Sequence, residues 1–194
     1  TIWIIEDTAP YVEAFKKVPC AYVADGHHRS ASAARAGAER RQANPDHTGE
    51  EEYNWFLTVL FPAGQLNILP YNRVVKDLNN QTPLAVLRRL RELGKLEETK
   101  EPSPDRPGVF CFYLDGVWHR LQVKKSLIDE SDPVNSLDVA VLQQRVLGPI
   151  FGIDDPRTSD RVDFVGGIRG TDELEKRVDH GDAAVGISMH HTTV

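Results

Sequence analysis

The sequence lacks a long hydrophobic run, a cysteine framework and an excess of positive charge. No apolar stretch approaches the roughly 20 residues that a membrane-spanning helix needs. Only two cysteines, Cys20 and Cys111, occur in 194 residues, and their spacing matches neither a zinc site nor a disulfide scaffold. The net charge of −6 opposes general binding to nucleic acid or to anionic membranes. These absences indicate a soluble globular protein, which we place in the cytoplasm, without a zinc site and with both cysteines buried and free.

The chain begins with an apolar run rather than with methionine. Residues 1–5 have neither the basic start nor the small-residue cleavage site of a signal peptide. They are typical of an interior strand, and residues 189–194 follow another strand-like run without a polar tail. We therefore expect a fragment of a longer protein, cut at both ends.

The first part of the chain contains four short apolar runs that predict strands. They lie at residues 2–5, 21–24, 55–61 and 66–69. The alanine-rich residues 30–36 predict a helix with Gly37 as its C-terminal cap. The polar residues 39–53 predict a long exposed loop that is either highly mobile or acts as a lid near residue 26. Trp3, Trp55 and Trp118 are predicted to lie in the core.

The second part shows a regular alternation of helix and strand patterns. The strongest is the pair of runs at residues 109–114 and 117–123, joined by Asp115-Gly116, which predicts a hairpin. The other predicted elements are a helix at 82–93 ending at Gly94, a surface connection at 97–108, a helix at 137–147 capped by Ser136 or Asn135, a strand at 162–165, a helix at 171–178 and a strand at 183–188. The whole is an α+β chain with a soft boundary near residue 80, giving portions 1–80 and 81–194.

The segment Asp25-Gly26-His27-His28-Arg29 carries the clearest chemical signal. An apolar run, a glycine turn and an alanine-rich helix follow one another here, which exposes free backbone N–H groups that favour anions. Gly26 permits a tight turn, and Arg29 can bind phosphate oxygens in a bidentate manner. The sequence therefore predicts an anion site at this turn, and the alternative is an ordinary solvated turn.

Seven residues are candidates for the site. Asp25, His27 and His28 are the candidate catalytic residues, with Asp25 suited to hold Mg²⁺ or a ligand hydroxyl. The candidate phosphate ligands are Gly26, His27, His28, Arg29, Ser30 and Arg73. For Arg73, after Pro70, an ordinary surface arginine is the alternative.

The chain resembles domain-of-unknown-function family 1015, whose members carry a YIADGHHRYETA-type signature. Residues 21–34 match that signature, and the likeness extends over nearly the whole chain through further matching segments. These are residues 1–5, 53–61, 68–75, 137–140 and 162–170. The chain departs from the family at Ser30 and Ser32, where Tyr and Glu are frequent, and at His190-His191, where Tyr-Pro is common.

The resemblance implies a ParB/sulfiredoxin-like mixed sheet with helices in residues 1–80, lacking its N-terminal part, and a truncated α+β portion in residues 81–194. It also implies nucleotide binding, because relatives in that superfamily include kinases that phosphorylate free L-serine with ATP or ADP. Others are partition proteins that bind CTP. In the kinases a glutamate upstream of the turn is thought to be the base, and Glu6 and Asp7 are poor substitutes because they follow the first strand. Inheriting the kinase activity is an analogy.

The sequence supports two alternative hypotheses of function. The first is a small-molecule kinase acting on a free amino acid-type substrate, with ATP or ADP (or CTP) and Mg²⁺, and with the phosphates on the Gly26–Arg29 turn. The second is a ParB-like nucleotide-dependent switch without phosphoryl transfer to a metabolite. The acidic balance and the lack of a helix-turn-helix count against nucleic-acid partners. A sulfiredoxin-like enzyme is excluded because its cysteine is missing at the turn.

Two further patterns are weaker. His190 and His191 could build a metal site with the histidines at 27 and 28, although neighbours in a strand point to opposite faces. The glycine-rich residues 166–170 favour a structural turn, with an anion-binding nest as the alternative.

Overall fold

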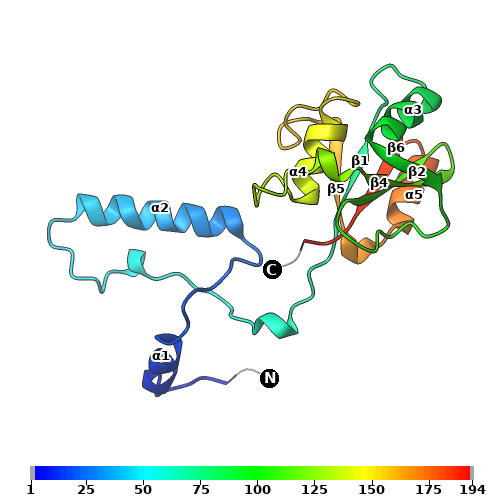
Figure 1. Ribbon diagram of the computed structural model, residues 1–194. Coiled ribbons are helices and arrows are strands. Elements are labelled where there is room, and N and C mark those ends of the chain that lie inside the picture. The colour runs from blue at the N-terminus through cyan, green and yellow to red at the C-terminus, as the bar shows by residue number, and fades with distance from the viewer. Residues whose placement is uncertain (1–2, 193–194) are drawn as a thin grey trace. The chain divides into compact units, whose positions relative to one another are not determined.

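The computed structural model describes residues 3–192 and divides the chain into two compact units, Thr1–Ala63 and Gly64–Val194 (Figure 1). The prediction of an α+β chain is confirmed, since the described residues form five helices and a six-stranded sheet. The division precedes strand β1 (Tyr71–Val75), whose residues fall within the predicted first portion, 1–80. In the described part of the chain, no helix combines the length and the apolar character that crossing a bilayer requires.

The first unit contains helices but, within residues 3–63, no strand and no buried residue. Helix α1 (Ala9–Phe15) is short, and helix α2 (His27–Ala43) is the longest helix described. A 3-10 turn, η1 (Glu52–Asn54), folds back against α2, and a second one, η2 (Ala63–Gln65), lies at the junction with the second unit.

The four strands predicted in the first 70 residues do not form. Residue 2 lies outside the described residues, and the rest of these runs pair with no other segment of residues 3–192. Their large side chains are exposed, with Trp3 at 78% and Trp55 at 66%, so the prediction of core tryptophans is wrong for these two and correct for the buried Trp118. Cys20 is also exposed. An apolar run becomes a strand only where a neighbour accepts its hydrogen bonds and covers its apolar face, and the described part of the chain provides no such neighbour for these runs.

Helix α2 extends further in both directions than residues 30–36. It continues through Gly37, which was predicted to cap it, and ends at Ala43 before Asn44 and Pro45. Glycine at position 37 allows residue 53 to pack closely on the helix, because a Cβ atom there would lie 2.8 Å from the backbone oxygen of Tyr53. The predicted loop at residues 39–53 is therefore shorter, and its end packs on the helix.

The second unit is built on one antiparallel sheet in the order β2-β4-β3-β6-β1-β5. Besides β1, its strands are β2 (Gly94–Glu98), β3 (Val109–Leu114), β4 (Val117–Val123), β5 (Val162–Gly166) and β6 (Val185–Met189). The sheet contains none of the strands predicted before residue 70, and it is antiparallel rather than mixed. It lies wholly in this unit.

The hairpin prediction is confirmed residue by residue. Strands β3 and β4 pair with Leu114 opposite Val117, and Asp115 (φ 53°) and Gly116 (φ 77°) take the left-handed conformations of a type I′ turn. Strand β2 was not predicted, and its last two residues fall in the predicted surface connection at 97–108. It begins at Gly94, directly after a helix, where a Cβ atom would lie only 1.9 Å from the Gln122 backbone oxygen.

Helices cover both faces of the sheet. Helix α3 (Pro83–Leu93) is capped by the Thr82 hydroxyl, which accepts a hydrogen bond from the Ala85 amide at 3.3 Å. It shares the larger core with α4 (Asp138–Leu142) and the π-helix that follows, η4 (Gln143–Leu147). Helix α5 (Asp172–Asp179) covers the smaller core on the other face, which includes Cys111 and Trp118. Two 3-10 turns, η3 (Lys125–Leu127) and η5 (Gly167–Arg169), complete the unit.

The remaining helix predictions hold with small shifts. The helix predicted at 137–147 is split into α4 and η4, and neither Ser136 nor Asn135 caps it, since Leu137 takes the N-cap position without a side-chain hydrogen bond. The strands and helix predicted after residue 160 all form within two residues of their predicted ends.

Candidate functional site

The Asp25–Gly26 turn leads directly into α2. Gly26 has φ +80°, a left-handed conformation that a side chain would strain, and it occupies the N-cap position. The Asp25 carboxylate accepts a hydrogen bond from the Gly26 amide at 2.7 Å. His27, His28 and Arg29 form the first turn of the helix instead of belonging to the loop before it, and this corrects the predicted position of the turn.

Three backbone amides at the start of α2 have no acceptor within residues 3–192. The first amide that bonds back along the chain is that of Ser30, which donates to the Gly26 oxygen at 2.9 Å. No side chain caps the helix, so the amides of His27, His28 and Arg29 point outward unpaired. Together with the helix dipole of a 17-residue helix, they form a region of positive potential.

Arg29 lies over this turn. Its Nη2 atom would be 3.3 Å from a Cβ atom built on Gly26. It is 3.9 Å from an Asp25 carboxylate oxygen, a loose ion pair whose side chains are 80% and 97% exposed. A pair this exposed contributes little to stability. The guanidinium is therefore available to an incoming anion, and the glycine is what lets it approach the backbone.

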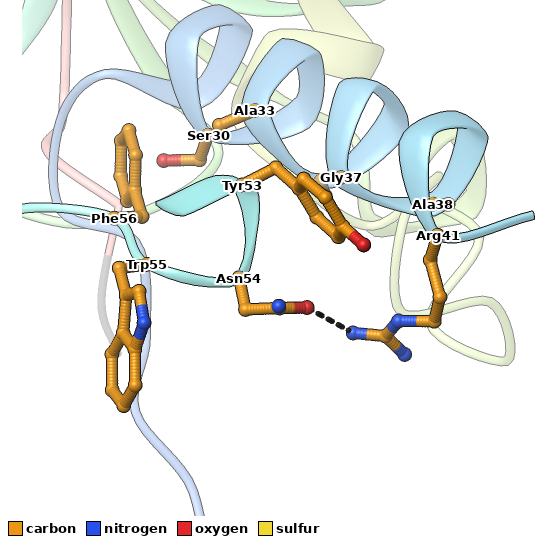
Figure 2. A pocket seen from close by; sticks show the side chains of 10 residues that line it. Ser30, Ala33, Gly37, Ala38, Arg41, Tyr53, Asn54, Trp55 and Phe56 are labelled. Atoms are coloured by element: carbon orange, nitrogen blue, oxygen red, sulfur yellow. Dashed lines mark hydrogen bonds between the residues drawn. The ribbon is translucent and has the colours of Figure 1, made fainter. Parts of the chain in front are cut away.

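A groove of about 380 Å³ runs along α2 from the same end (Figure 2). Its floor is a stripe of small residues at helical spacing, beginning with Ser30 and continuing through Ala33, Ala34, Gly37 and Ala38. Residues 53–56 form the opposite wall. At the far end the Arg41 guanidinium donates to the Asn54 side-chain oxygen at 3.1 Å, as Figure 2 shows. Ser30 thus lies at the point where the turn opens into the groove.

The segment that forms this wall is held by its own polar side chains. The Tyr53 hydroxyl accepts a hydrogen bond from the side-chain Nδ2 of Asn44 at 3.0 Å and lies 2.9 Å from His47 Nδ1. The Glu51 carboxylate accepts hydrogen bonds from the Thr48 amide at 2.7 Å and the Gly49 amide at 3.0 Å. These bonds, led by the one from Thr48, lower the pKa of Glu51 to about 2.

Arg73 belongs to the second unit. It is the third residue of β1, only 8% exposed, so it is not an ordinary surface arginine. Its guanidinium carbon lies 4.2 Å from the Phe164 ring centre and 5.1 Å from that of Tyr71, and the two rings stack at 5.3 Å. Burial lowers the pKa of Arg73 to about 10. No carboxylate within residues 3–192 pairs with it.

Sequence reasoning missed the two aromatic neighbours of Arg73. Tyr71 could have been found, because residues two apart in a strand share a face. Phe164 could not, because its place opposite Arg73 depends on the register of β1 with β5. The buried Asn72 was missed as well, and its side-chain oxygen accepts a hydrogen bond from the Met189 amide at 3.2 Å.

The weaker candidates remain structural. Among residues 3–192 no three His, Cys, Asp or Glu side chains gather as a metal site would require. His190 Nδ1 lies 3.3 Å from the Pro104 backbone oxygen, and its ring is 4.3 Å from that of His191. Within the glycine-rich residues 166–170, Gly167–Arg169 form the turn η5, and Gly170 follows it at φ +69°.

Comparison with known proteins gives a family but no closer relative. Neither the curated proteins nor the solved structures include a match to this chain. Residues 1–140, more than two thirds of the sequence, match the family described as "Protein of unknown function (DUF1015)". That match includes the turn, the groove and Arg73. The chain belongs to this family.

Proposed function

We propose that the protein binds a nucleoside di- or triphosphate, with its phosphates on the first turn of α2, and transfers a phosphoryl group to a free amino acid-type substrate. The observation that carries the proposal is the uncapped start of this helix, where three unpaired amides and the exposed Arg29 converge over Gly26. Phosphate oxygens are the groups that such an arrangement favours.

Each residue of the turn has a part in this proposal. The amides of His27 and His28 and the Ser30 hydroxyl donate to phosphate oxygens, and Arg29 supplies a planar pair of donors. The imidazoles add hydrogen-bond donors at the edge of the turn. The catalytic contribution is positioning and charge neutralisation, which dominate phosphoryl transfer.

Asp25 is suited to help hold Mg²⁺ against the nucleotide. Its carboxylate is 97% exposed, and only one of its oxygens is bound by the Gly26 amide. Mg²⁺ in nucleotide sites is commonly held by one or two carboxylates together with phosphates and water, so a lone aspartate fits. When bound, the ion neutralises the charge of the phosphates.

A second function, nucleotide-dependent switching without phosphoryl transfer, is favoured by one observation. Residues 25–30 offer a single carboxylate, that of Asp25, and no second acidic side chain that could act as the base. Binding alone needs no base.

One experiment separates these functions. The chain is incubated with Mg²⁺ and ATP, ADP or CTP plus a pool of amino acids, and products are followed by mass spectrometry. We expect a phosphorylated amino acid from the wild-type chain and from Arg35→Ala, an exposed control on the same helix, but not from Arg29→Ala. Nucleotide binding without any phosphorylated product supports the switch, and the absence of both contradicts the proposal.

A further inference from the structure

Arg73 is buried among apolar side chains, and no counter-ion pairs with it within residues 3–192. It stands opposite Phe164 on β5 and Ile187 on β6, and Ile187 belongs to the larger core. Directly opposite residues of antiparallel strands share a face, so the guanidinium emerges at the rim of this core, beside the half-exposed Tyr71. Burying a charge in such a place is unfavourable unless a partner compensates it.

The protein provides hydrogen-bond acceptors for only one of the three guanidinium nitrogen atoms of Arg73. Its Nη1 group donates to the backbone oxygens of Tyr71 and, at 3.2 Å, Asn72. Within residues 3–192, Nε and Nη2 donate to nothing. Neither atom is among the fully buried polar atoms that lack a partner, so solvent still reaches this edge.

In two other arginines of this unit, the Nε and Nη2 groups of the guanidinium bind a carboxylate. Arg157 donates from Nε and Nη2 to Asp155, at 3.0 Å each, and Arg161 uses the same two groups for Asp77. Both of these arginines are more exposed than Arg73. The most deeply buried of the three thus presents its two parallel donors to solvent, in the fork geometry that matches two oxygens of one anion.

We infer that Arg73 is an oxyanion site, which binds the carboxylate or phosphoryl group of a small molecule through Nε and Nη2. Tyr71 and Phe164 fix the plane of the guanidinium, and the backbone oxygens at Nη1 fix its direction. The site lies wholly in the second unit and uses no residue of α2, so it goes beyond the proposed function.

The test is a titration of the Nε–Hε resonance of Arg73 in ¹H–¹⁵N spectra of the full chain. The chain carries Arg29→Gln, which removes the proposed nucleotide site and keeps the two questions separate. Inorganic phosphate and acetate are added in turn, with sodium chloride at equal ionic strength as the reference. The resonance is assigned by its loss in Arg73→Lys, and Arg161, whose edge Asp77 already occupies, is the internal control.

We expect a saturable shift at Arg73 with phosphate or acetate, none with chloride and none at Arg161. Saturation with phosphate alone identifies a phosphoryl ligand, and saturation with acetate alone identifies a carboxylate ligand. In Arg73→Lys, neighbouring backbone amides should report affinity about tenfold weaker, because an ammonium keeps the charge but loses the fork. No saturable shift with either anion, or an equal shift with chloride, overturns the inference.

Discussion

The two units of this chain use similar apolar runs with opposite results. In the second unit, residues 109–114 form β3, every residue of which is buried. In the first unit, the equally apolar residues 55–61 stay extended, with Leu57 at 94% exposed and Val59 at 74%. Composition does not distinguish these segments. What distinguishes them is that β3 lies between β4 and β6, whereas residues 55–61 have no neighbouring strand within residues 3–192.

The residues that stabilise the fold and the candidate binding residues lie in different units. The second unit holds both hydrophobic cores. The first unit holds the exposed turn at Gly26 and the groove beside it, and no buried residue within 3–63. Substitutions in the first unit should therefore change binding with little effect on the stability of the second, and core substitutions should do the reverse.

The largest expected effect tests the core. Phe112→Ala should lower the free energy of unfolding by about 3–5 kcal/mol, because the ring is fully buried and leaves a cavity. The matched change Phe56→Ala should alter it by less than about 0.5 kcal/mol, because that ring is 51% exposed. Urea unfolding followed by the fluorescence of Trp118, with Trp3 and Trp55 changed to phenylalanine, reports on the second unit. Similar losses of unfolding free energy in Phe112→Ala and Phe56→Ala would contradict the difference between the two units.

A smaller effect, of opposite sign, is expected at Arg73. Its pKa of about 10 lies below the ordinary value for arginine, so the folded state disfavours the charged form. The resulting destabilisation is complete below about pH 10 and disappears only above the unfolded pKa. Arg73→Met should therefore raise the unfolding free energy at pH 7 by about 1–3 kcal/mol in the absence of anions. A clear loss of stability would mean that the bonds to the Tyr71 and Asn72 oxygens outweigh burial.

The smallest effect concerns the wall of the groove. The pKa of Glu51 is lowered to about 2 by hydrogen bonds that exist only in the folded segment. Their stabilising contribution is complete above the ordinary value of 4.5 and is lost as the pH falls toward 2. Residues 44–54 should loosen over that range while the second unit keeps its structure. A carboxyl titration by NMR measures this directly, and a midpoint near 4.5 for Glu51 would contradict it.

The sequence predicted local structure well and pairing poorly. Asp115-Gly116 specifies its hairpin through backbone conformations that few other residues adopt, and Thr82 and Pro83 specify the start of α3. By contrast, the strands expected before residue 70 needed partners that the sequence cannot name. Gly37 was misread because glycine serves both to end helices and to admit close neighbours, and only the Tyr53 contact distinguishes the two roles.

The candidate site shows the same division. The turn at Gly26 could be predicted, because a glycine that permits a left-handed turn directly precedes the alanine-rich helix in the sequence. The groove could not, because its wall comes from residues 53–56, which fold back onto the helix. Arg73 was identified from the sequence, but its burial and its aromatic neighbours depend on the register of three strands.

The central claim is that the start of α2 binds nucleotide phosphates through Arg29. Calorimetric titration with ATP, ADP and CTP in the presence of Mg²⁺ tests it most directly, with thermal melts of each variant alongside. Arg29→Ala should weaken binding about tenfold or more, Arg29→Lys should recover part of the loss, and Arg35→Ala should bind like the wild type. All melting temperatures should stay unchanged, because Arg29 is exposed. Equal affinity of Arg29→Ala and the wild-type chain for every nucleotide would contradict the account.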